Sequence, residues 1–154
     1  MKLEYQRLPE LSPQHNELLR RLALALDKIQ YGATSGATSH KIGSFTRDMS
    51  LASGTQAITG VGFQPKVVWF ISALGTRLSN GYDDGSSCVC QWFLFGFTGN
   101  AGILTSFSIV YYVDSTTKYE GKIQSMDSDG FTISWTKTGS PTGTLTVGYL
   151  AFKY

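Results

Sequence analysis

Histidine is scarce in this sequence, and the scarcity limits the chemistry that the chain can perform. Only two of the 154 residues are histidine, His15 and His40, and neither lies in the strand-rich region that follows residue 43. Histidine is the commonest acid–base side chain near neutral pH. Without it, no Ser-His-Asp or Cys-His set can be assembled in that region. We therefore expect a protein that is not an enzyme and uses no cofactor.

An excess of one charge and long apolar runs are also lacking. The 13 basic and 11 acidic residues leave a net charge of +2, too small and too scattered for a surface that binds nucleic acid or an anionic membrane. No run of about 18 apolar residues could span a bilayer, and residues 1–4 do not begin a signal peptide. We expect a soluble chain with no nucleic-acid partner and no membrane insertion.

Cysteine occurs only as Cys88 and Cys90. In a strand, this spacing places both side chains on one face, which is poor geometry for a mutual disulfide. Two thiols without nearby histidines cannot complete a zinc site. We interpret both as reduced, buried core residues, and we expect no metal site.

Paired carboxylates occur at two places, and each pair has two interpretations. Asp83-Asp84 follow Asn80-Gly81, and Asp127 and Asp129 precede Gly130. Paired carboxylates could cleave glycosides, and the second group also resembles part of a calcium loop that lacks its distal glutamate. Aspartate in turns is more simply explained by hydrogen bonds to the local backbone. We expect turn residues at both places.

The composition and the pattern of the chain divide it into an appendage and one domain. The apolar fraction of 42% is that of a folded protein. Residues 1–11 alternate charge with isolated apolar side chains, of which Leu3, Tyr5 and Leu8 are candidates for docking onto a partner. Residues 12–31 predict a helix that Ser12-Pro13 begins. Residues 32–44 are predicted to be a flexible linker of small residues, and residues 45–154 a β domain.

The predicted helix carries one apolar stripe, which must be buried against something. Its members recur at spacings of three and four and are His15, Leu18, Leu19, Leu22, Leu26 and Ile29. Packing on the β domain of the same chain is one possibility. The flexible linker favours the other, a three-stranded stalk formed with two further copies, because a helix that belongs to its own core is rarely tethered so loosely. We expect a homotrimer.

From residue 43 onward the hydrophobic period becomes that of strands, and turn signals separate the runs. About eight strands are predicted: Ser44–Ser50, Gln56–Val61, Lys66–Leu74, Ser87–Phe97, Ile103–Val113, Lys118–Met126, Phe131–Lys137 and Thr144–Lys153. With no helix between them, they predict a mainly β fold, an antiparallel β-sandwich or jelly roll, preceded by one N-terminal helix.

Two of the predicted strands are apolar on both faces. The strand 144–153 has apolar residues at alternate positions and adds Leu150 and Phe152 on the other side, and residues 92–97 are almost wholly apolar. One face of each would meet the opposing sheet, and the second would meet a neighbouring subunit. A monomer could not easily hide all of this surface.

Two segments carry a resemblance to a known class of protein. Gly54–Phe70 contains Gly62-Phe63-Gln64-Pro65-Lys66-Val67-Val68-Trp69-Phe70, and Asp129–Gly139 contains Asp129-Gly130-Phe131-Thr132-Ile133-Ser134-Trp135. Over roughly residues 43–154 the chain resembles fibre and decoration proteins of tailed bacteriophages, in which such phrases belong to a β-sandwich that trimerises. The first segment also resembles, over a shorter stretch, H-type lectin domains.

The resemblance implies a virion structural protein. Residues 1–11 would dock on head or tail proteins of a particle assembled in the bacterial host cytoplasm, and the trimeric sandwich would be displayed outward for surface attachment. The alternative is a lectin-like tip that binds a host-surface glycan. Trp92, Tyr82 and Tyr111 are candidates for stacking on sugar rings, although each could instead lie in the core or in a subunit interface.

The stalk model gives a first prediction. Leu22 lies at the centre of the apolar stripe and should be buried in the stalk whichever other stripe residues form the contact between helices. Leu22→Ala therefore removes one buried contact from each chain of a trimer. Fully buried Leu→Ala changes cost ~2–5 kcal/mol, and a short stalk should lie near the lower end because it can relax. We expect loss of helical ellipticity and of trimer mass, with the β domain still folded.

The control is Arg21→Ala, whose side chain should face solvent. Equal behaviour of the two variants, or unfolding of the β domain by Leu22→Ala with the helix retained, would show that the helix belongs to the core of the domain.

Overall fold

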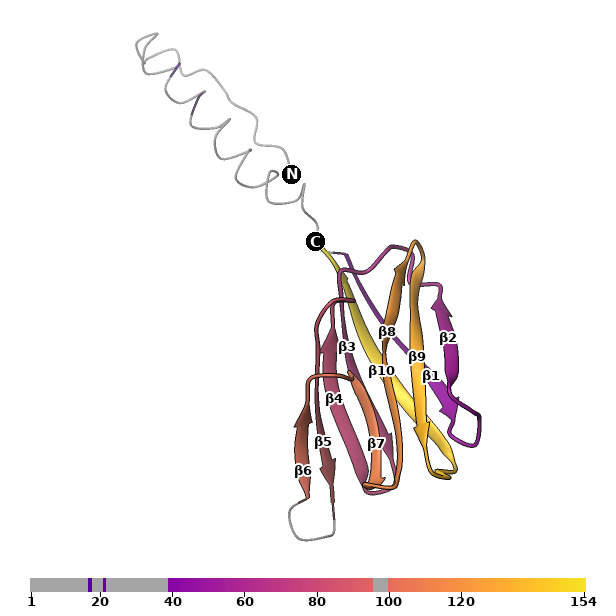
Figure 1. Cartoon of the computed structure of the whole chain (residues 1–154). Coiled ribbons are helices and arrows are strands. Elements are labelled where there is room, and N and C mark those ends of the chain that lie inside the picture. Colours follow the sequence, from indigo (N-terminus) through magenta and orange to yellow (C-terminus); the bar gives the residue numbers. More distant parts are fainter. Residues whose placement is uncertain (1–16, 18–20, 22–38, 96–99) are drawn as a thin grey trace. The chain divides into compact units, whose positions relative to one another are not determined.

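The computed structural model describes residues 39–95 and 100–154, together with Glu17 and Arg21 (Figure 1). The chain divides into two compact units, Ser39–Lys153 and the remainder. In the remainder, Arg21 Nε lies 3.1 Å from Glu17 Oε1 at the i, i+4 spacing. The expected arm residues Leu3, Tyr5 and Leu8 lie outside the described residues. So do the expected stalk residues, which are His15, Leu18, Leu19, Leu22, Leu26 and Ile29.

The unit Ser39–Lys153 consists of strands joined by turns. Its strands are β1 (Ser39–Asp48), β2 (Gly54–Thr59), β3 (Val67–Leu74), β4 (Arg77–Asp83), β5 (Cys88–Leu94), β6 (Ala101–Leu104), β7 (Ile109–Asp114), β8 (Thr117–Asp127), β9 (Gly130–Thr138) and β10 (Thr144–Lys153). They form a six-stranded sheet in the order β1-β10-β3-β4-β5-β6 and a four-stranded sheet in the order β2-β9-β8-β7. All neighbouring strands are antiparallel.

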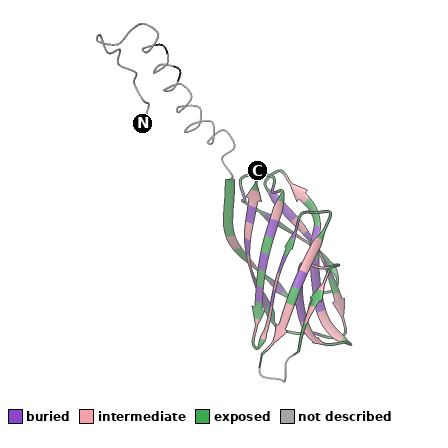
Figure 2. Cartoon of the chain, turned by 90° about the vertical axis from the view of Figure 1, so that its left-hand side faces the viewer, coloured by how far each residue is buried: buried purple, intermediate pink, exposed green. Residues whose placement is uncertain are grey.

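The two sheets pack face to face, as in a β-sandwich (Figure 1). Phe70 of β3 meets Phe131 of β9 edge to face with ring centroids 5.6 Å apart, and Phe131 meets Tyr149 of β10 at 5.3 Å. Burial alternates along the strands (Figure 2), as the strand period requires when one face of each sheet is turned to the core. The mainly β prediction is therefore confirmed, with two antiparallel sheets.

A buried arginine joins β1 to the four-stranded sheet. The Arg47 side chain is 9% exposed, and its Nε and Nη2 donate to Tyr119 Oη at 3.0 and 2.9 Å. Nη2 also donates to the carbonyl of Ala52 at 3.1 Å, and the guanidinium lies 5.7 Å from the ring centroids of both Tyr119 and Trp135. Hydrogen bonds and ring faces together replace part of the hydration that a buried cation loses.

The largest departures of the strands from the sequence predictions concern β1, the β6–β7 region and β4. β1 begins at Ser39, so the predicted linker 32–44 ends earlier than expected. The predicted strand Ile103–Val113 is divided into β6 and β7. β4 is absent from the predicted strands, because Asn80-Gly81 before Asp83-Asp84 indicates a turn.

The position of Gly81 explains the missed strand. A Cβ at this position would collide with the backbone carbonyls of Ser108 and Val89. Glycine is therefore needed here for the close approach of a neighbouring segment and not for a turn. Asp83, expected in a turn, is consequently the last residue of β4, whereas Asp84 does lie in a turn and accepts from the N–H groups of Ser86 and Ser87.

The β8–β9 hairpin turn at Asp127–Gly130, which was predicted, carries a contact to the end of β2. Asp129 accepts hydrogen bonds from the N–H of Gly62 at 2.6 Å and of Gly60 at 3.0 Å, and its own carbonyl accepts from Val61 N–H at 3.1 Å. The bonds from Gly62 and Gly60 hold the pKa of the Asp129 carboxyl below its usual value. The turn residue therefore fixes the chain that leaves β2.

This contact predicts a pH-dependent stability. Because the folded-state pKa of Asp129 is lowered, its contribution is present above the unfolded pKa of about 3.9 and is lost as the pH falls through the folded value. We expect Asp129→Asn to lower the melting temperature by a few degrees at pH 7. The difference from the unmodified chain should shrink steadily below about pH 4.

Asp127→Asn is the matched control, since it makes the same charge change in the same hairpin where the carboxylate accepts from the Thr132 hydroxyl. A stability difference for Asp129→Asn that stays constant from pH 7 to pH 2.5 would contradict the assignment.

Candidate functional site

The outer face of the six-stranded sheet carries continuous rows of uncharged side chains. The register places Ile42, Leu150, Trp69, Tyr82 and Val89 in one cross-strand row. The next row consists of Ser44, Gly148, Ile71, Asn80, Gln91 and Ile103. A third row, beside the first, consists of His40, Phe152 and Val67. A fourth row, beside the second, consists of Thr46, Thr146, Ala73, Leu78, Phe93 and Ala101. We call these rows the apolar face; none of their residues is Lys, Arg, Asp or Glu.

Several large side chains of the apolar face are well exposed, whereas Leu78, Phe93, Leu150 and Phe152 are half-buried. Ile42 is 72% exposed, Trp69 55%, Ile71 53% and Ile103 68%. They come from β1, β3 and β6, so the exposure extends from one edge of the sheet to the other. An isolated exposed apolar residue is normal on a protein surface, whereas a continuous patch marks an interaction site.

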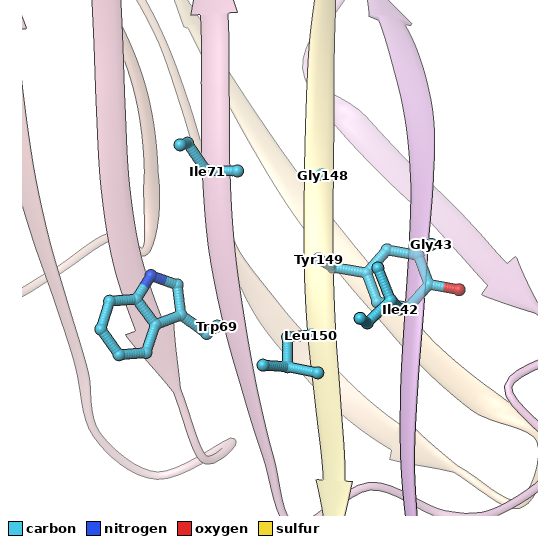
Figure 3. A pocket seen from close by; sticks show the side chains of 7 residues that line it. All are labelled: Ile42, Gly43, Trp69, Ile71, Gly148, Tyr149 and Leu150. Atoms are coloured by element: carbon cyan, nitrogen blue, oxygen red, sulfur yellow. The ribbon is translucent and has the colours of Figure 1, made fainter.

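A groove of about 350 Å³ crosses this face over β10 (Figure 3). Ile42, Trp69, Ile71 and Leu150 surround it, and Gly148 lies between them. A Cβ on Gly148 would lie only 3.2 Å from Ile71 Cγ2. The missing side chain at Gly148 therefore creates the depression, because Ile71 beside it and Leu150 and Trp69 in the next row are large.

The outer face of the four-stranded sheet has a different chemistry. Its outward positions on β2 and β9 are mainly hydroxyl residues: Thr55, Thr59, Thr132, Ser134, Thr136 and Thr138. On β8, Lys118 Nζ lies 3.0 Å from Glu120 Oε1, and Lys122 is exposed. Glu120 is buried beneath Lys118, and the remaining outward positions of β2, β8 and β9 are mainly polar. The outer face of the four-stranded sheet is thus polar, whereas the outer face of the six-stranded sheet is mainly apolar.

The predicted sugar-stacking residues are not brought together. Tyr82 is 45% exposed on the apolar face. Tyr111 is 8% exposed, and the Arg77 guanidinium lies 5.3 Å from its ring centroid. Trp92 is half-buried and stacks on Tyr112 with ring centroids 4.2 Å apart. Tyr111 and Trp92 therefore follow the alternative that the sequence left open, because their ring faces contact the protein itself.

Trp69 is an exposed aromatic residue of the apolar face that sequence reasoning did not select. Along β3, Val67, Trp69 and Ile71 lie on one face and Val68 and Phe70 on the other. Both groups are apolar, however, so hydrophobicity could not tell which face was turned outward. Only the position of β3 inside the six-stranded sheet decides it.

The buried carboxylate of Asp83 has a structural role. Asp83 is 2% exposed, and its Oδ2 accepts from Ser108 Oγ at 3.0 Å and from Ile123 N–H at 2.8 Å, while Oδ1 accepts from Gly85 N–H at 2.9 Å. These bonds join the end of β4 to β8 of the other sheet. A small polar pocket of about 240 Å³ lies beside it, with Lys122 in its lining. Because both carboxylate oxygens are already bonded, Asp83 is poorly placed to accept a proton from a substrate.

The two cysteines are free, as expected. Cys90 is buried, and burial raises the pKa of its thiol to about 11. Cys88 is half-buried, and burial, followed by the nearby charge of Asp83, raises the pKa of its thiol too. Both thiols are protonated at neutral pH and are therefore weak nucleophiles.

Other kinds of site were sought in the same part of the chain. Within residues 39–95 and 100–154, with Glu17 and Arg21, no three His, Cys, Asp or Glu side chains gather as a metal site would require. Over the same residues, no helix is long and apolar enough to cross a membrane. Comparison with protein-family models, with curated proteins and with solved structures gives no match for this chain. The apolar face is the strongest candidate for a functional surface.

Proposed function

We propose that this chain is a non-catalytic structural protein of a bacteriophage virion, a head or tail fibre or decoration protein. It assembles as a homotrimer, its residues 1–11 dock on the particle, and the β domain is displayed outward for surface attachment. It is made in the bacterial host cytoplasm and functions on the virion.

The observation that carries this proposal is the apolar face. Its exposed residues Ile42, Trp69, Ile71 and Ile103 occupy a sheet whose other side already covers the core. A domain that devotes a whole second face to apolar contact is suited to assembly with other protein. The resemblance of Gly54–Phe70 and Asp129–Gly139 to phage fibre proteins supplies the biological setting.

The docking arm gives a direct test of the function. Its apolar residues Leu3, Tyr5 and Leu8 have no local core to join in the sequence, so they are suited to pack on a particle protein. We expect mass spectrometry of purified phage particles to detect the full chain at a fixed copy number. A chain without residues 1–11 should be lost from the particles while remaining folded in the lysate.

The control replaces residues 1–11 by a Gly/Ser segment of equal length, which keeps the spacing and removes the apolar side chains. Normal copy number with either altered chain would contradict docking through this arm. Absence of the full chain from particles would contradict the proposed function itself.

A second candidate, a glycan-binding tip, is favoured by one observation. Trp69 and Tyr82 are directly opposite each other in the β3–β4 register, and both are more than two-fifths exposed. Adjacent aromatic rings beside the amides of Asn80 and Gln91 offer stacking and hydrogen bonds to a sugar.

A glycan array tests this candidate. If the face binds sugar, the full chain should give a specific signal that Trp69→Ala and Tyr82→Ala each reduce at least tenfold, while Tyr112→Ala, which alters an internal ring pair, leaves the specificity unchanged. No signal from the unmodified chain would exclude the candidate for the glycans displayed.

A further inference from the structure

We propose that copies of this chain bury the apolar face against one another. The inference rests on the homotrimer of the proposed function and adds to it the surface through which the β domains associate.

The size of the face fits one side of a protein interface. Five of its strands, β1, β10, β3, β4 and β5, have seven or more residues. At about 3.4 Å per residue and about 4.8 Å between strands, they cover roughly 24 Å by 24 Å, or roughly 600 Å² before side-chain relief is counted. A standard interface buries about 800 Å² of accessible surface on each partner. Covering this face alone would therefore give an interface close to standard size.

The chemistry of the face indicates a second copy and not an unrelated charged partner. The rows contain no Lys, Arg, Asp or Glu, so a charged surface would lose its hydration against them without gaining a counter-charge. The outer face of the four-stranded sheet, with the partly exposed Lys118 and the exposed Lys122, is such a surface. Among the described residues, the matching uncharged face is the apolar face itself.

The few polar groups on the face are also their own complements. Asn80 and Gln91 carry amides that both donate and accept, and Ser44, Thr46 and Thr146 carry hydroxyls that do the same. A second copy therefore offers donors and acceptors to these groups, which reduces the cost of excluding water from them.

The connection to the predicted stalk would bring the copies together. β1 begins at Ser39, and the predicted helix ends at residue 31, so residues 32–38 join them. A small-residue linker of this length spans roughly 15 Å on average. Domains tethered so closely to one three-stranded stalk experience an effective concentration of about a millimolar. Even a weak contact through the apolar face would then form.

The test uses the full chain and compares variants on the two outer faces by sedimentation equilibrium, with thermal melts to verify folding. Trp69→Lys places a charge at the centre of the proposed contact, and its control Thr136→Lys places the same charge on the exposed face of a central strand in the other sheet. Ile103→Lys and Ala57→Lys form a second pair on edge strands, where both residues are exposed. Gly148→Val fills the groove without adding charge.

We expect Trp69→Lys and Ile103→Lys each to weaken association about 100-fold or more, because each buries an unpaired ammonium group at the contact. Gly148→Val should weaken association at least tenfold. Thr136→Lys and Ala57→Lys should associate like the unmodified chain. All five variants should melt cooperatively at low concentration, because the substituted positions face away from the core.

The other outcomes overturn the inference in distinguishable ways. If every variant keeps the mass of the unmodified oligomer, the copies assemble through the stalk alone, and the apolar face is not the contact. A full chain that is monomeric at about 100 μM would contradict association of any kind at concentrations where standard-size interfaces form. In either case, the particle content tests the virion function separately.

Discussion

β10 lies in the interior of the six-stranded sheet, between β1 and β3, and is apolar on both sides. Leu145, Val147 and Ala151 point to the core, where each is almost fully buried. Leu150 and Phe152 point the other way. A single domain has one core, so it can cover only one face of this sheet. The core of the domain thus covers one apolar face of β10. The groove at Gly148 lies on the other face, which the domain itself does not cover.

On the core side of the six-stranded sheet, polar side chains as well as hydrophobic packing join it to the four-stranded sheet. Arg47 and Asp83 are both buried, and each bonds from the six-stranded sheet to groups of the other sheet or the loops beside it. Removing a partner from such a group would leave a buried charge poorly solvated. These contacts therefore fix how the two sheets meet. They explain two charged residues without requiring any catalytic role for them.

The alternation of apolar and polar residues correctly predicted strands such as β9 and β10. It failed for β4, where a contact with a distant segment of the chain determines which residue is needed. The predicted strands Phe131–Lys137 and Thr144–Lys153 agree with β9 and β10 to within a residue at each end. β4 was missed because Gly81 is required by the carbonyl of Ser108, a residue distant in the sequence. The same limit applies to the site. Tyr111 and Trp69 have similar sequence surroundings, and only the packing of β7 and β3 makes one buried and the other exposed.

The central claim is that the apolar face is covered when the full chain is assembled. Hydroxyl-radical oxidation of Trp69, followed by mass spectrometry, tests it most directly, because this indole is 55% exposed in the isolated chain whereas Trp135 is 1% exposed. In the assembled full chain, Trp69 should be oxidised nearly as slowly as Trp135, and dilution to the monomer should restore rapid oxidation. Equally rapid oxidation of Trp69 in the oligomer and in the monomer would contradict the account.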